Sequence, residues 1–173
     1  LVAAETLGSV SVICSDKTGT ITEGEMGVTD VVSFAESYLI EDLSQKNLKE
    51  VAEIIDVITL CNDADLVACE DGMELKGSPT EKALMQAIID LGIDVDQLKS
   101  KHSRTAEIPF DSARKFMVTA NDWSGGSRLL FKGAPGIILQ SCDRIRLGGK
   151  SVKMTDSQRK KLIAQVDMLT QKG

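Results

Sequence analysis

The chain has 173 residues, 42% of them hydrophobic and 27% charged, which is enough for one sizeable core or one core and part of a second. Its net charge of −6 argues against nucleic acid or an anionic membrane surface as a partner. No apolar run approaches the roughly 20 residues that a membrane-spanning helix needs, and no signal-peptide pattern opens the chain.

Four cysteines and one histidine bear on metal binding and redox state. Cys14, Cys61, Cys69 and Cys142 form no CxxC pair, and His102 alone cannot complete a zinc-ligand set at the usual spacing. We therefore expect free thiols in a reducing cytosol.

Apolar patterning predicts the elements of the first half of the chain. A β-branched run predicts a buried strand over 9–14 that ends in a loop, and alternation predicts a second strand over 26–34. Apolar residues at helical spacing predict a helix over 47–62. A turn at 70–72 then separates two short candidate strands.

The next helix is indicated by its capping residues. Ser78 is a suitable N-cap, Pro79 fits the first helical position, and Glu81 stands three residues after the serine. Gly92 can close this helix in the left-handed conformation. A short helix is expected to follow over 94–101.

Three candidate strands come next, at 106–111, 115–120 and 127–132, with a turn at 121–126 between the last two. Strands and helices do not alternate regularly along the chain. The order of elements therefore favours an α+β fold.

The last part of the chain predicts two helices around a hairpin. Pro135 can start the first helix, and the hairpin strands are expected at 144–147 and 151–154. The second helix begins at Thr155, where Gln158 completes a capping box.

The run CSDKTGT at positions 14–20 has the chemistry of a phosphoryl-transfer site. A carboxylate at a strand end, Asp16, suits a nucleophile, while loop amides, Lys17 and the Thr20 hydroxyl can stabilise charge on the transferring oxygens. Phosphatases of the haloacid-dehalogenase type carry an acid–base aspartate two residues after the nucleophile. This chain has Thr18 there, which favours a long-lived acyl phosphate over a phosphatase.

The run DKTGT is the phosphorylation signature of P-type ATPases. The flanking runs at 5–8 (ETLG), 12–15 (VICS) and 21–22 (IT) also resemble that family. The resemblance implies an antiparallel β-sheet flanked by helices over 29–173, the nucleotide-binding domain. Before it, 1–28 would supply a strand fragment of the haloacid-dehalogenase-like phosphorylation domain.

The same resemblance implies the phosphoryl-transfer roles. Asp16 is then the catalytic residue that receives the γ-phosphate of ATP, and Lys17, Thr18 and Thr20 support the phosphate site. In the full enzyme Asp16 and Thr18 also bind Mg²⁺, so that ATP and Mg²⁺ are the implied cofactors.

Three further runs resemble the nucleotide-binding domain of the same family, in the same order. They are KGSPTEKAL at 76–84, IPFDSARKFM at 108–117 and FKGAP at 131–135.

These runs imply five nucleotide-binding residues. The resemblance places Glu81 at adenine, where a carboxylate can accept a hydrogen bond from the exocyclic amino group. Phe110 would stack on the base, an interaction of ~1–3 kcal/mol for nucleic-acid bases. Lys115 and Lys132 would add positive charge to the pocket, and Gly133 would allow close approach of the ligand.

Simpler explanations stand beside these roles. A capping box by itself accounts for Glu81, an isolated phenylalanine such as Phe110 is commonly a core residue, and a lysine at a strand end, as Lys132 is, is commonly solvated. The family usually continues KGAP with glutamate, whereas this chain has Gly136. The local role of that glutamate is then missing.

The resemblance further implies a cytosolic domain of an integral membrane protein whose partners are the rest of the phosphorylation domain, the actuator and the membrane helices. The later aspartates of the Mg²⁺ site are not in this sequence. We therefore expect a pump fragment that binds ATP without turning it over.

Two other function classes stay open on the sequence alone. A free-standing nucleotide-binding module would have no membrane segments or downstream GDG-type motif in its gene. A soluble phosphatase would hydrolyse a generic phosphomonoester, which Thr18 disfavours.

Overall fold

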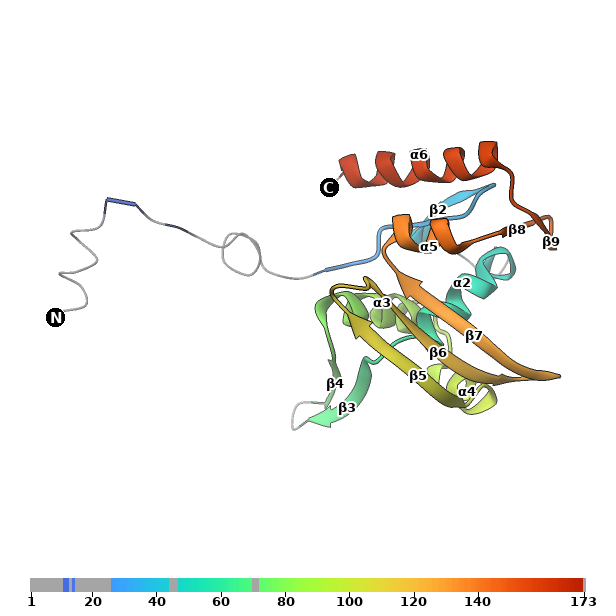
Figure 1. Ribbon diagram of the computed structural model, residues 1–173. Coiled ribbons are helices and arrows are strands. Elements are labelled where there is room, and N and C mark those ends of the chain that lie inside the picture. Colours follow the sequence, from blue (N-terminus) through green and yellow to red (C-terminus); the bar gives the residue numbers. More distant parts are fainter. Residues whose placement is uncertain (1–10, 13, 15–25, 44–46, 70–71, 173) are drawn as a thin grey trace.

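The structure is a computed structural model that describes residues 11–12, 14, 26–43, 47–69 and 72–172. These residues form the predicted α+β fold, with small antiparallel sheets flanked by helices (Figure 1). In chain order the elements are β1 (Asp30–Val32), β2 (Ser37–Leu39), the 3-10 helix η1 (Ile40–Asp42), α2 (Leu48–Leu60), β3 (Asp65–Cys69), β4 (Gly72–Lys76), α3 (Pro79–Asp90), α4 (Val95–Lys101), β5 (Arg104–Asp111), β6 (Phe116–Trp123), β7 (Gly126–Gly133), α5 (Pro135–Ser141), β8 (Arg144–Leu147), β9 (Lys150–Lys153) and α6 (Asp156–Lys172).

The strands differ from the sequence-based prediction mainly in length. Of the strand expected over 26–34, only the three residues of β1 form a strand. β1 pairs with β2, which was not predicted. β6 and β7 are longer than expected, because their ladder continues to Trp123 opposite Gly126. The prediction of a six-residue turn at 121–126 is therefore wrong: residues 124–125 alone connect β6 and β7. Half of the strand predicted over 9–14 lies outside the described residues, and the described half, residues 11–12 and 14, is in no strand.

A three-stranded antiparallel sheet, β5–β6–β7, is the largest sheet among the described residues. α2 and α4 cover one of its faces (Figure 1). Met117 and Leu130 from that face form a buried cluster with Leu60 and Cys61 at the end of α2, and Leu98 of α4 packs against it. This cluster holds α2 and the sheet together and so fixes the segment that follows α2.

A second buried cluster joins the N-terminal hairpin to the helices. Val31 of β1 packs with Val51 and Ile55 of α2 and with Ile88 of α3. α2 thus has the apolar stripe that its helical periodicity predicted, and the structure shows that residues of α2 take part in two clusters.

The helix ends follow their capping residues. Ser78 accepts a hydrogen bond from the Glu81 amide, and Gly92 closes α3 with a φ of 71°. Thr155 and Gln158 exchange the two bonds of a capping box at the start of α6. These local predictions are confirmed.

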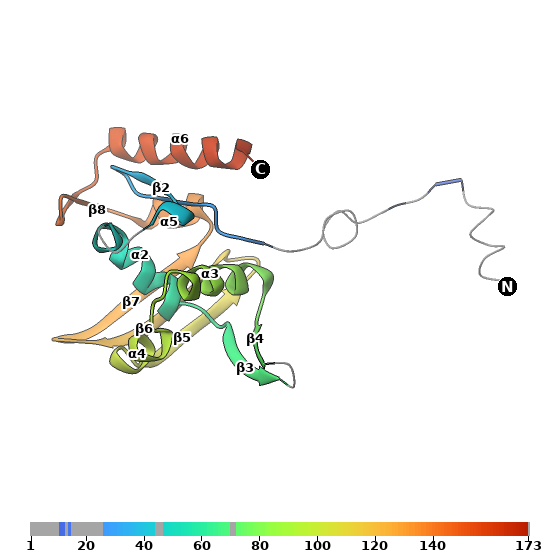
Figure 2. The ribbon, with the colours of Figure 1, turned by 180° about the vertical axis from the view of Figure 1, so that it is seen from behind.

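α6 lies over α5 and the β1–β2 hairpin when the molecule is seen from behind (Figure 2). Arg159 donates to the carbonyls of Leu139 and Cys142 at the end of α5, and Lys161 lies 4.4 Å from the Phe34 ring. Across the described part of the chain, no helix combines the length and apolar character that crossing a membrane requires.

Candidate functional site

The structure brings the five predicted nucleotide-binding residues together at one end of the three-stranded sheet. Glu81 comes from the first turn of α3, Phe110 from the end of β5, Lys115 from the turn before β6, and Lys132 and Gly133 from the end of β7. They line a pocket of about 570 Å³, within the usual size of small-molecule sites. The remaining lining residues are Ser78, Thr80, Leu84 and Ala134.

The Glu81 carboxylate is held by three donors. Its Oε1 accepts from the Lys132 Nζ at 3.0 Å and from the backbone amide of Asp63 at 3.2 Å. Its Oε2 accepts from the Ser78 hydroxyl at 3.0 Å. Both charged side chains are mostly buried, with 15% of Glu81 and 19% of Lys132 exposed. A carboxylate has about four acceptor positions, so that one remains for a ligand.

Opposing effects act on the acidity of Glu81. Burial by itself would raise the pKa of this carboxyl. The hydrogen bond and charge of Lys132, with the donors from Asp63 and Ser78, outweigh burial and hold the pKa below its usual value. The site therefore presents a charged acceptor at neutral pH.

A β-bulge turns Phe110 into the pocket. Ile108 stands opposite Val118, but Asp111 stands opposite Phe116, so that β5 has one more residue here than β6. Along an unbroken strand Phe110 would share a face with Ile108; the extra residue moves it to the face of Lys132. With 56% of its surface exposed, Phe110 is not the core residue that it could have been from sequence alone.

A tight turn positions Lys115. The Asp111 carboxylate accepts from the amides of Ala113 and Arg114, each at 2.9 Å, and these bonds lower the pKa of Asp111. Lys115 itself has a φ of 62°, the left-handed region that costs most residues energy. The prediction that Lys115 begins a strand is therefore wrong: it closes a turn, and the strand starts one residue later.

Gly133 has no side chain to obstruct the pocket, and it also lets two segments of the protein's own backbone lie close together. A Cβ at this position would lie 2.5 Å from the Lys115 carbonyl oxygen and 2.5 Å from the Phe116 Cβ. The Ala134 amide donates to that same carbonyl at 2.8 Å. Glycine at 133 thus lets the end of β7 lie directly against the turn that carries Lys115.

The segment between α2 and β3 supports the site and was not predicted from the sequence. Asn62 is almost fully buried; its side chain donates to the Glu81 carbonyl at 3.2 Å and accepts from the Ala64 amide at 2.8 Å. The Asp63 amide holds the Glu81 carboxylate. An Asn-Asp pair directly after a helix is a turn signal that could have drawn attention to this segment.

The predicted phosphoryl-transfer residues, Asp16, Lys17, Thr18 and Thr20, lie outside the described residues. Within the described residues, no three His, Cys, Asp or Glu side chains are grouped so that they could hold a metal ion. The Mg²⁺ site predicted at Asp16 and Thr18 accordingly stays a prediction.

A second hollow, of about 640 Å³, lies between the segment after Met26 and α3. It is slightly larger than the pocket at Glu81, but it contains no lysine or aromatic side chain among its lining residues. We place the functional site at Glu81, because charge, an exposed aromatic ring and a close-approach glycine meet there.

Comparisons with known proteins show which family the chain belongs to. Residues 50–173 match the family model described as P-type ATPase, cytoplasmic domain N. The whole chain is 38% identical over 173 residues to calcium-transporting ATPase 1 of Lactococcus lactis, of which it covers 19%. It is 37% identical over 164 residues to a calcium-transporting ATPase of Listeria monocytogenes and 34% identical over 178 residues to potassium-transporting ATPase alpha chain 2 of Homo sapiens. These alignments include 90% and 92% of this chain, and 18% and 17% of the two relatives. The chain thus spans about a fifth of the length of the relatives it matches.

Proposed function

This chain belongs to the P-type ATPases, and from that premise we propose that it is the part of a cation pump that binds ATP and carries the aspartate to be phosphorylated. In this proposal residues 1–28 belong to the phosphorylation domain and 29–173 to the nucleotide-binding domain. Asp16 receives the γ-phosphate, with Lys17, Thr18 and Thr20 around it. The parent protein is a membrane pump whose other domains complete the cycle.

One observation carries the ATP-binding proposal: side chains from four separate segments converge on a pocket that contains an exposed aromatic ring, a mostly buried carboxylate and two lysines. A purine can stack on Phe110. The unused acceptor position of Glu81 suits the exocyclic amino group of adenine. Lys115 and Lys132 supply positive charge for an anionic ligand in a chain that is acidic as a whole.

Mg²⁺, when bound, would offset the repulsion between the Asp16 carboxylate and a phosphate. We propose Asp16 and Thr18 as its ligands from this chain, in the full enzyme only. The chain by itself should therefore bind ATP without hydrolysing it. ATPase activity of the purified chain well above background, lost in Asp16→Asn, would contradict this part of the proposal.

Titration of the chain with ATP, followed by isothermal calorimetry and by NMR, tests the pocket. Phe110→Ala should weaken ATP binding by about 5- to 150-fold, the range expected for loss of one stacked base. Phe131→Ala is the matched control, because Phe131 is a half-exposed phenylalanine on β7 that does not line the pocket. If the two variants weaken binding equally, or if neither does, the pocket is wrongly placed.

Lysine variants give a second comparison. Lys132→Ala should weaken ATP binding, since it removes positive charge and a partner of Glu81. Lys150→Ala, at an exposed position in the β8–β9 hairpin, is the charge-matched control and should leave affinity unchanged.

A further inference from the structure

The segment Leu60–Ala64 is a junction of three parts of the fold. Asn62 and Asp63 bind the first turn of α3 through the carbonyl and the carboxylate of Glu81. The Thr119 hydroxyl of β6, which donates to the Asn121 side chain at 2.8 Å, lies 3.5 Å from the Leu60 carbonyl oxygen. This short segment therefore sets where the Asp63 amide points, and that amide is one of three donors to Glu81.

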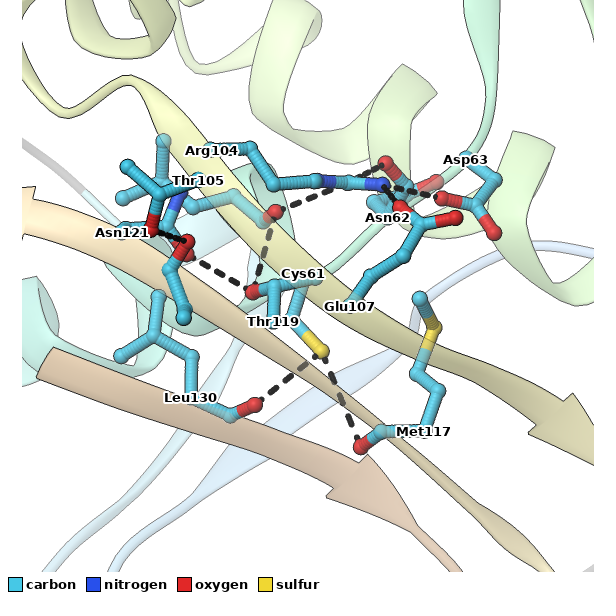
Figure 3. Close-up of polar contacts among 12 residues, drawn as sticks. Cys61, Asn62, Asp63, Arg104, Thr105, Glu107, Met117, Thr119, Asn121 and Leu130 are labelled. Atoms are coloured by element: carbon cyan, nitrogen blue, oxygen red, sulfur yellow. Dashed lines mark hydrogen bonds and ion pairs between the residues drawn. The ribbon is translucent and has the colours of Figure 1, made fainter.

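Arg104, the first residue of β5, binds this segment at three points (Figure 3). One terminal nitrogen donates to the carbonyls of Leu60 at 3.0 Å and Asn62 at 2.7 Å. The other pairs with the Asp63 carboxylate at 2.6 Å and with Glu107, its neighbour on β5, at 2.7 Å. The guanidinium thus holds both the backbone and a side chain of the segment, although it does not line the pocket.

We propose that Arg104 is a positioning residue for base recognition: by fixing Leu60–Asp63 it aims the Asp63 amide at Glu81 and so orients the carboxylate that reads the exocyclic amino group of adenine. This inference rests on the proposed ATP-binding function. It assigns a selectivity role to a residue that does not touch the ligand.

The geometry requires an arginine rather than any cation. Two carbonyls and two carboxylates surround the side chain, and the planar fork of a guanidinium can donate to all four at once. A lysine ammonium has three donors on a flexible stem and cannot reproduce that set. Arg104→Lys therefore keeps the positive charge but loses some of the hydrogen bonds that hold Leu60–Ala64.

NMR of the chain without nucleotide tests the first step. The Asp63 amide proton donates to a carboxylate, so that its resonance should report the ionisation of Glu81 as pH is lowered. In Arg104→Lys we expect this resonance to shift and its pH response to shrink, whereas Arg128→Lys should leave both unchanged. Arg128 is the matched control because it packs on the Trp123 ring at 4.1 Å, on the same sheet. An unchanged Asp63 resonance in Arg104→Lys would overturn the proposal.

Nucleotide selectivity tests the second step. ATP is compared with purine riboside triphosphate, which keeps the ring and the phosphates but lacks the exocyclic amino group. Arg104→Lys should lower ATP affinity about 3- to 10-fold, the loss expected for one weakened hydrogen bond, and change affinity for the analogue less than about twofold. Equal losses for both ligands would mean a general structural role and would overturn the proposal.

The outcomes also separate this inference from the proposed function. If the wild type binds no ATP, both fail. If the wild type prefers ATP to the analogue and Glu81→Ala removes that preference, but Arg104→Lys does not reduce it, only the role of Arg104 fails. Should Arg104→Lys not fold, Asp63→Asn loosens the same contact while keeping the backbone amide, and a preserved preference in that variant overturns the proposal.

Discussion

Replacing Gly133 by alanine should damage both the fold and the pocket. The added Cβ would lie 2.5 Å from the Lys115 carbonyl oxygen, 2.5 Å from the Phe116 Cβ and 2.8 Å from the Phe116 Cα. Ordinary van der Waals contacts of a Cβ are 3.4 Å or longer, so the strands must separate by about an ångström, as in overpacked sites. Most of the atoms that must move are backbone, which no side-chain rotation can relieve.

Overpacking of this kind costs about 1–3 kcal/mol of unfolding free energy. For a chain of this size that corresponds to a fall in Tm of about 2–12 °C. The single tryptophan, Trp123, stacks on His102 at 3.7 Å and gives a fluorescence signal for urea or thermal unfolding. The hydrogen bond from the Ala134 amide to the Lys115 carbonyl lies at the same place, and both residues line the pocket. ATP affinity should therefore fall as well.

Gly136→Ala is the matched control, three residues further along the chain. A Cβ there meets nothing within 4 Å, and the position lies in the first turn of α5. Alanine should be neutral or should stabilise the protein by up to about 1 kcal/mol, because glycine is a poor helix former. Equal stabilities of Gly133→Ala and the wild type would refute the close-approach argument.

Three further predictions concern the site and its supports. The pKa of Glu81 is lower in the folded than in the unfolded protein, so the Glu81–Lys132 pair should stabilise the protein above the unfolded carboxyl pKa of about 4.3. This stabilisation should be lost as pH falls through the folded-state pKa. In urea titrations the stability difference between wild type and Glu81→Gln should therefore shrink between pH 7 and pH 3, and a constant difference would contradict the prediction. Asp111→Ala removes the acceptor of two turn amides and should lower stability by about 1–2 kcal/mol. Because this turn positions Lys115, the substitution should also weaken ATP binding. Calorimetry measures both effects, with Asp122→Ala as the control. Ser78→Ala removes the N-cap of α3 and should cost about 0.5–2 kcal/mol in thermal unfolding; an unchanged Tm would argue against the cap.

Features that depend on neighbours in the chain were predictable. The N-cap at Ser78, the capping box at Thr155 and the left-handed Gly92 each involve residues within a few positions of one another. The apolar stripe of α2 depends only on helical spacing, and its helix was located to within two residues at each end. The family resemblance likewise came from short runs, and the comparisons confirm it for residues 50–173.

The tertiary structure decided the rest, because the deciding contacts join residues far apart in the chain. Glu81 and Lys132 are 51 positions apart, and nothing local to either residue states that they pair. The bulge that turns Phe110 depends on how β5 meets β6, and a sequence pattern cannot count residues on a partner strand. The hold of Arg104 on Leu60–Asp63 spans more than 40 positions in the same way. Sequence alone thus determined the family and the candidate site residues, while packing determined which atoms face the pocket and what keeps them there.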